Sequence, residues 1–77
     1  MDLGEIRLEF EAGRLKEAVI EPAPGRNGWV LRFKDASGSL VSLAAAGEAE
    51  RVFHSLDAAT RLAQEIGFHT VHVEEQF

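Results

Sequence analysis

Alternating apolar and polar residues predict short strands along the first half of the chain. Residues 5–11 alternate between apolar and charged side chains, which is typical of a strand with one buried face. The apolar members are Ile6, Leu8 and Phe10. A second strand is expected over residues 15–21, and Gly13 in the break between them can take the positive φ of a hairpin turn.

The central part of the chain predicts two further strands joined by a tight turn. Residues 29–34 alternate, with Trp29, Leu31 and Phe33 on one face and Val30, Arg32 and Lys34 on the other. Residues 35–38 place Asp first and Gly fourth, as a type I turn prefers, so a return strand is expected over residues 39–43. The ambiguous residues 44–50 are interpreted as an irregular connection, and residues 51–54 as a candidate short strand.

The clearest signal is an amphipathic helix that begins after Ser55 and ends before Gly67. Ser55 is a good N-cap, and Asp57 lies near the positive end of the helix dipole. One arc of the helical wheel is entirely apolar, and its members are Leu56, Ala58, Ala59, Leu62, Ala63 and Ile66. Residues 70–74 predict a final strand, with Val71 and Val73 inward. It must return to an edge of the sheet or insert within it, and it can run parallel to a neighbour.

This order predicts a single α+β domain over residues 1–77. We expect two layers: an antiparallel β-sheet of four to six strands, with one amphipathic helix packed on one face, in the order β-β-β-β-(β)-α-β. The core is predicted to centre on the largest inward side chains, namely Phe10, Trp29, Phe33, Phe53, Leu62 and Ile66.

Composition narrows the classes of protein to consider. The 77 residues carry a net charge of −5 and contain no cysteine, which excludes a disulfide framework and zinc sites built on cysteine. The sequence has neither a signal-peptide pattern nor an apolar run of the ~20 residues that a membrane span needs. A cytoplasmic protein with no membrane partner is therefore expected.

The candidate catalytic and ligand-binding residues do not converge on a reaction. His69 and His72 lie on opposite faces of a strand, so they would not share a metal ion. His54 lies close to Ser55 and Asp57, but a capping Ser55 already uses its oxygen on backbone N–H groups. The glycines match neither a phosphate-binding loop nor a dinucleotide fingerprint. We therefore expect a non-enzymatic protein with no cofactor and no metal.

The one basic stretch, residues 26–34, predicts a binding surface formed by Arg26, Asn27, Arg32 and Lys34. No acidic residue lies in this stretch, and the prolines of the preceding loop reduce the entropy that docking costs. The first hypothesis is therefore an accessory or interaction module that binds a protein partner, with a second copy of the chain as one candidate. The alternative is a small nucleic-acid-binding protein that uses the same basic region.

Five segments carry a resemblance to a known group of proteins. They are residues 28–33 (Gly-Trp-Val-Leu-Arg-Phe), 51–59 (Arg-Val-Phe-His-Ser-Leu-Asp-Ala-Ala), 62–63 (Leu-Ala), 66–68 (Ile-Gly-Phe) and 71–75 (Val-His-Val-Glu-Glu). Together they resemble small proteobacterial proteins of plasmids and integrated elements, of the partition-associated type. The resemblance implies an accessory role beside DNA segregation machinery, and it supplies no catalytic residues.

Overall fold

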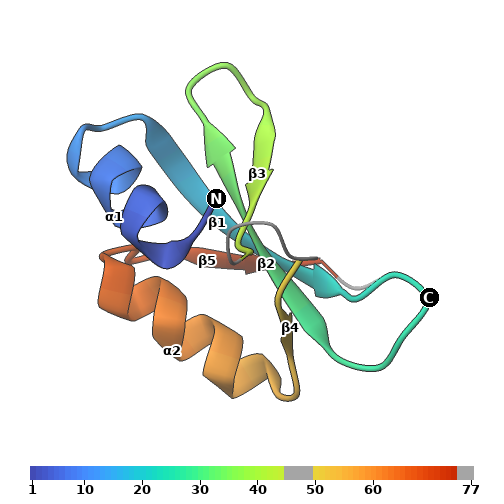
Figure 1. Ribbon diagram of the computed structural model, residues 1–77. Coiled ribbons are helices and arrows are strands. Elements are labelled where there is room, and N and C mark those ends of the chain that lie inside the picture. Colours follow the sequence, from blue (N-terminus) through green and yellow to red (C-terminus); the bar gives the residue numbers. More distant parts are fainter. Residues whose placement is uncertain (45–49, 75–77) are drawn as a thin grey trace.

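The computed structural model describes residues 1–44 and 50–74, which form a five-stranded mixed sheet and two helices (Figure 1). In chain order the elements are α1 (Leu3–Glu11), β1 (Leu15–Pro22), β2 (Trp29–Asp35), β3 (Leu40–Ser42), β4 (Val52–Phe53), α2 (Leu56–Ile66) and β5 (Val71–Val73). The predicted α+β class, with helix packed on sheet, is confirmed. The predicted strands at residues 15–21, 29–34, 39–43, 51–54 and 70–74 are confirmed within a few residues at their ends.

The prediction of a strand over residues 5–11 is wrong, because these residues form α1. Leu3, Ile6 and Phe10 are spaced as one face of a helix, and all three contribute to the core. Leu8, which the alternation placed beside Ile6, is 65% exposed, whereas Ile6 is fully buried. The apolar residues of this segment fit both the two-residue period of a strand and the 3.6-residue period of a helix. The helix is favoured because it buries one face against the core.

Both ends of α1 are defined by local hydrogen bonds. At the start, Asp2 Oδ1 accepts from the Glu5 N–H (2.8 Å) and Glu5 Oε1 accepts from the Asp2 N–H (3.0 Å), which is a capping box. At the end, Gly13 takes a φ of +78°, and the Arg14 N–H donates to the Glu9 carbonyl (3.0 Å). The glycine expected in a hairpin turn therefore ends a helix in a Schellman motif.

The sheet has the strand order β3-β2-β1-β5, and β4 pairs with β2 beyond the end of β3. The pairs made by β2 are antiparallel, as predicted, whereas β5 runs parallel to β1, a direction that the sequence left open for the last strand; the sheet is therefore mixed. The chain explains this direction. Helix α2 begins beside the end of β1 and runs back to its start, so β5 must retrace β1 in the same direction (Figure 1).

The turn and the helix that the sequence predicted most clearly are confirmed. In the turn after β2, the Gly38 N–H donates to the Asp35 carbonyl (3.0 Å). Ser55 Oγ accepts from the Ala58 N–H (3.1 Å) at the start of α2. Of the predicted irregular connection, residues 45–49 lie outside the described residues, while Ala44 and Glu50 form an antiparallel bridge.

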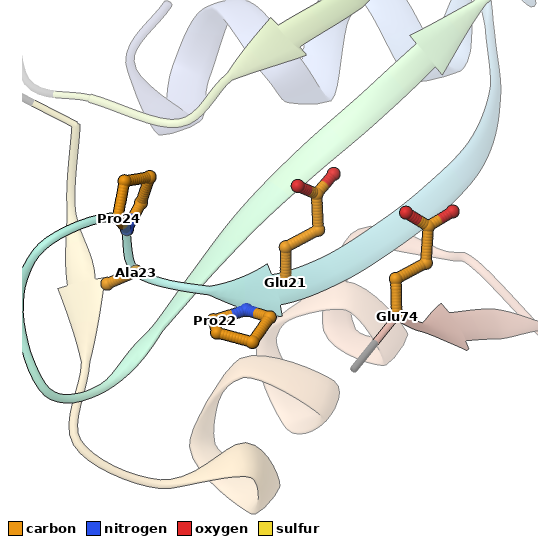
Figure 2. A pocket seen from close by; sticks show the side chains of 5 residues that line it. All are labelled: Glu21, Pro22, Ala23, Pro24 and Glu74. Carbon is orange, nitrogen blue, oxygen red and sulfur yellow. The ribbon is translucent and has the colours of Figure 1, made fainter. Parts of the chain in front are cut away.

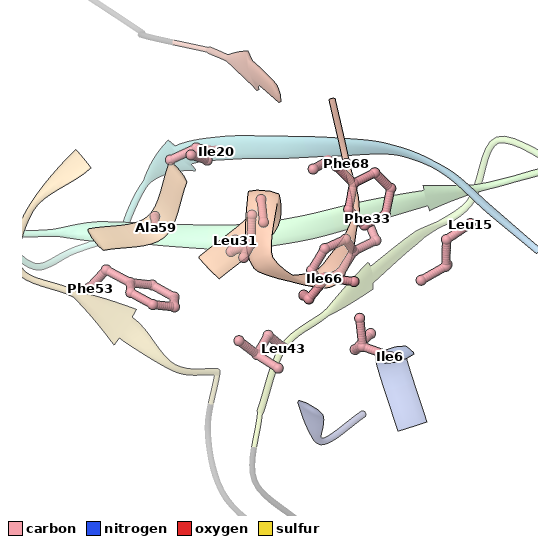
Figure 3. Packing of buried hydrophobic residues seen from close by; sticks show 12 residues of the cluster. Ile6, Leu15, Ile20, Leu31, Phe33, Leu43, Phe53, Ala59, Ile66 and Phe68 are labelled. Atoms are coloured by element: carbon pink, nitrogen blue, oxygen red, sulfur yellow. The ribbon is translucent and has the colours of Figure 1, made fainter. Parts of the chain in front are cut away.

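Both helices cover the same face of the sheet and share one hydrophobic cluster (Figure 3). Its fully enclosed members include Phe33 and Leu31 from β2, Ile20 from β1 and Ile6 from α1. Of the residues predicted to centre the core, Phe33, Phe53 and Ile66 are buried, whereas Phe10, Trp29 and Leu62 are half-buried and pack against the cluster. The buried members that the prediction did not include are Ile6, Leu15, Ala18, Ile20, Leu31, Leu43, Ala59, Ala63 and Phe68.

Replacing Ile6 and Leu8 in turn by alanine tests the first helix. We expect Ile6→Ala to lower the free energy of unfolding by about 2–5 kcal/mol, because it opens a cavity in the core. Leu8→Ala should change it by less than about 0.5 kcal/mol, because that side chain faces solvent. Urea denaturation measures both. Equal losses at the two positions would indicate the strand that the alternation predicts, in which both side chains share a face.

Candidate functional site

Arg32 of β2 is the centre of an ion-pair network on the sheet face opposite the helices. Its Nη1 donates to Glu21 Oε2 of β1 at 3.0 Å. Its Nε and Nη2 donate to the two carboxylate oxygens of Glu50, at 3.0 and 3.2 Å. The three side chains are only 23%, 19% and 18% exposed, in the order Arg32, Glu21 and Glu50. The network therefore holds Glu50 against the sheet.

The network shifts the ionisation of its members. Hydrogen bonds from Arg32 lower the pKa of the Glu50 carboxyl below its usual 4.5; burial opposes this shift, and a hydrogen bond with Ser42 adds to it. The same contact with Glu50 raises the pKa of Arg32. Both shifts favour the charged forms, so the bidentate pair is stabilised at neutral pH.

The other three residues predicted as a binding surface are more exposed. Lys34 Nζ lies 3.8 Å from Glu17 Oε2, and both side chains are 45% exposed, so this ion pair contributes little to stability. Arg26 and Asn27 lie exposed in the loop between β1 and β2. Arg26 is still close enough to Glu50 to contribute slightly to lowering its pKa. The fold thus brings Arg26 and Arg32 towards one carboxylate, with Lys34 further along β2.

The fold brings carboxylates from other segments of the chain to the residues predicted as a binding surface. Glu21 and Glu50 pair with Arg32, and Glu17 lies beside Lys34, so three carboxylates lie next to two of the basic side chains. Glu74 adds a fourth carboxylate to this face, in the hollow that it lines with Glu21. That Arg26, Asn27, Arg32 and Lys34 bind a partner stays a prediction.

In the part of the chain that the structure describes, the outer edge of β5 is an open edge of the sheet. Among the described residues, β5 pairs only with β1. The opposite edge, at β3, is partly closed by Met1, whose carbonyl accepts from the Ala44 N–H (2.8 Å) and whose amino group donates to the Ser42 carbonyl (3.2 Å). Both valines of β5 face inward as predicted, in register with Ala18 and Ile20, but Val71 is half-buried whereas Val73 is still 42% exposed.

Two hollows lie at the two ends of β5. The first, of about 250 Å³, is lined by Glu21, residues 22–24 and Glu74; the two carboxylates lie side by side on the face away from α2 (Figure 2). The second, of about 280 Å³, includes the aromatic rings of Phe10 and Phe68 with His69 and His72 at the start of β5. Lys16 and Glu17 of β1 complete its polar rim. An extended segment placed along β5 would reach both hollows.

All three histidines are exposed, and they occupy three different positions in the fold. His72 pairs in register with Val19 of β1, on the face away from the helices, while His69 precedes β5 and His54 precedes α2. Within residues 1–44 and 50–74, no group of three or more His, Asp or Glu side chains has an arrangement that could hold a metal ion. In that part of the chain, neither helix is long and apolar enough to cross a membrane.

Comparisons with protein families, curated proteins and solved structures found no match to this chain. The resemblance to partition-associated proteins therefore stays a prediction.

Neutralising Arg32 and Lys34 separately tests the ion-pair network. Arg32→Gln should lower the free energy of unfolding by about 1–3 kcal/mol, because it leaves Glu21 and Glu50 half-buried without their shared cation. Lys34→Gln, the matched control on the same strand, should change it by less than about 0.5 kcal/mol. Equal effects in thermal or urea unfolding would contradict a special role for Arg32.

The pH dependence of stability gives an independent test. The folded state lowers the pKa of Glu50, so the contribution of this carboxylate is complete above about pH 4.5 and is lost as pH falls through the folded-state pKa. We expect the difference in unfolding free energy between the wild type and Glu50→Gln to be constant from pH 8 to 6 and to shrink below pH 4.5. Urea titrations at each pH measure it, and a difference that grows on acidification would contradict the network.

Proposed function

We propose that this protein is a non-enzymatic interaction module that binds an extended segment of a partner protein as an additional strand beside β5. The observation that carries the proposal is the open outer edge of β5. Strand addition uses the backbone of the recipient edge for affinity and neighbouring side-chain hollows for specificity, and β5 offers both.

The direction of the backbone groups on β5 supports this. The Glu74 N–H donates to the Ile20 carbonyl of β1 at 2.8 Å. Because successive residues of a strand direct their N–H and C=O groups to opposite sides, Val71 and Val73 direct theirs away from β1. Two donors and two acceptors thus face outward, and each hydrogen bond to a partner strand would contribute about 0.5–1.5 kcal/mol net.

The short length of β5 limits what backbone pairing alone contributes. Three residues give few ladder hydrogen bonds, and association costs at least about 4 kcal/mol in lost freedom. Side-chain contacts must therefore add to the affinity. The half-exposed Val73 and the hollows at the two ends of the strand are the surfaces in reach of such an added segment.

The charges favour a protein partner over the nucleic-acid alternative. A phosphate backbone is repelled at long range by a chain of net charge −5, and Arg32 and Lys34 both lie beside carboxylates. The accessory role implied by the resemblance to partition-associated proteins is compatible with an interaction module.

Proline at position 73 tests the proposal directly. Val73→Pro removes an N–H that points away from β1, so the sheet should keep its own hydrogen bonds, while an added strand loses a donor. We expect partners captured from the native host to be lost with Val73→Pro and kept with Val73→Thr, which retains the N–H. Thermal unfolding of both variants checks that the fold is intact.

Two outcomes would contradict the proposal. Undiminished capture of the partner by a folded Val73→Pro variant would place binding elsewhere on the surface. Loss of all captured protein after nuclease treatment would favour the nucleic-acid alternative. A supporting measurement is hydrogen exchange, in which the Val71 and Val73 amides should become protected when the captured partner is bound.

A further inference from the structure

We infer that the segment added to β5 is basic and alternating, with apolar side chains towards the helices and a Lys or Arg side chain beside Glu74. This inference rests on the proposed strand addition and adds the chemistry of the partner. Three features of β5 carry it: the two faces of the strand, the acidic end and the aromatic end.

The two faces of β5 differ in polarity, and an added strand must match both. Val71 and Val73 lie on the helix side, in register with Ala18 and Ile20 of the core. His72 lies on the opposite face beside Val19. Because side chains of neighbouring strands at paired positions share a face, the partner contacts the two valines with every second residue and the polar face with the others. An alternation of apolar and polar residues satisfies this arrangement.

At the end of β5, the negative charge of Glu74 is not neutralised by an ion pair with any of the described residues. The side chains of Glu21, in β1, and Glu74, directly after β5, point the same way (Figure 2). Of these two carboxylates, only Glu21 accepts a hydrogen bond from Arg32, at its Oε2 atom. The other two hydrogen bonds of Arg32 go to Glu50, so the single positive charge of its guanidinium is already shared by the carboxylates of Glu21 and Glu50. Among the ion pairs of the described residues, none involves Glu74. A cation on the added strand complements this end, whereas a carboxylate or phosphate is repelled.

The other end of β5 is different, which gives the segment a preferred register. The hollow there includes Phe10 and Phe68, whose ring centroids are 4.7 Å apart. Its polar rim carries a cation and a carboxylate, Lys16 and Glu17, together with His69 and His72. An apolar side chain fits the aromatic surface there, while the basic side chain belongs at the Glu74 end.

A random-peptide display library is a suitable probe, because it does not presuppose the partner. The folded wild-type protein serves as bait, beside Val73→Pro, Glu74→Lys and Glu65→Lys. Glu65 lies exposed on α2, so Glu65→Lys makes the same change of charge away from the proposed position and is the matched control. We expect wild type and Glu65→Lys to enrich alternating sequences with Lys or Arg several-fold above their library frequency. Glu74→Lys should lose this enrichment, and binding of the selected peptides should weaken with added salt.

The outcomes separate the two proposals. Peptides that depend on the Val73 N–H but carry no excess of Lys or Arg would overturn the basic partner and leave strand addition standing. The same basic peptides selected by wild type and by Glu74→Lys would also overturn the role of Glu74. Selection of the same peptides by a folded Val73→Pro bait, or no enrichment over empty beads, would overturn strand addition and the inference with it.

Discussion

The contact of Phe68 with Phe10 and Phe33 joins the parts of this fold that are distant in sequence. Phe68 lies directly after α2, 4.7 Å from the ring of Phe10 on α1 and 5.3 Å from that of Phe33 on β2, measured between centroids. The approach is close enough that a Cβ on Gly67 would lie 2.5 Å from the Phe10 ring. Gly67 also has a φ of +133°, which L side chains rarely adopt. Both helices and the central strand therefore depend on a position that only glycine fits well.

The same contact determines where the last strand begins. Once Phe68 is buried, the chain leaves the aromatic cluster at the start of β1, and β5 can only run towards the end of β1, alongside it. It therefore ends beside the loop that follows β1, which brings Glu74 next to Glu21 (Figure 2). The course of α2 and the burial of Phe68 at its end thus together account for the parallel direction of β5 and for the acidic hollow at its end.

Local sequence signals were enough to predict much of this fold. The wrong predictions concern features that depend on contacts between segments distant in sequence. Helix α2 has a capping residue, a continuous apolar arc and a terminating glycine, so its own sequence was enough to predict it. The apolar residues of α1 fit a strand as well as a helix, and only the capping pair of Asp2 and Glu5 distinguished them locally. The candidate surface was harder still. Arg32 pairs with carboxylates 11 and 18 residues away, and Glu50 lies in a segment without periodicity, so no sequence pattern located its partner.

Glu21 connects the stability of the sheet face with its capacity for recognition. Arg32 donates one hydrogen bond to Glu21 but two to Glu50, so the pair with Glu50 holds the guanidinium in place whatever happens to Glu21. A cation arriving beside Glu74 would share Glu21 with Arg32 rather than displace Arg32 from the sheet. Because Glu21 keeps only 19% of its side chain exposed, its desolvation is largely complete before any partner arrives. A strand added beside β5, as proposed, would thus meet a carboxylate that the fold has already oriented, which would lower the cost of binding a cation there.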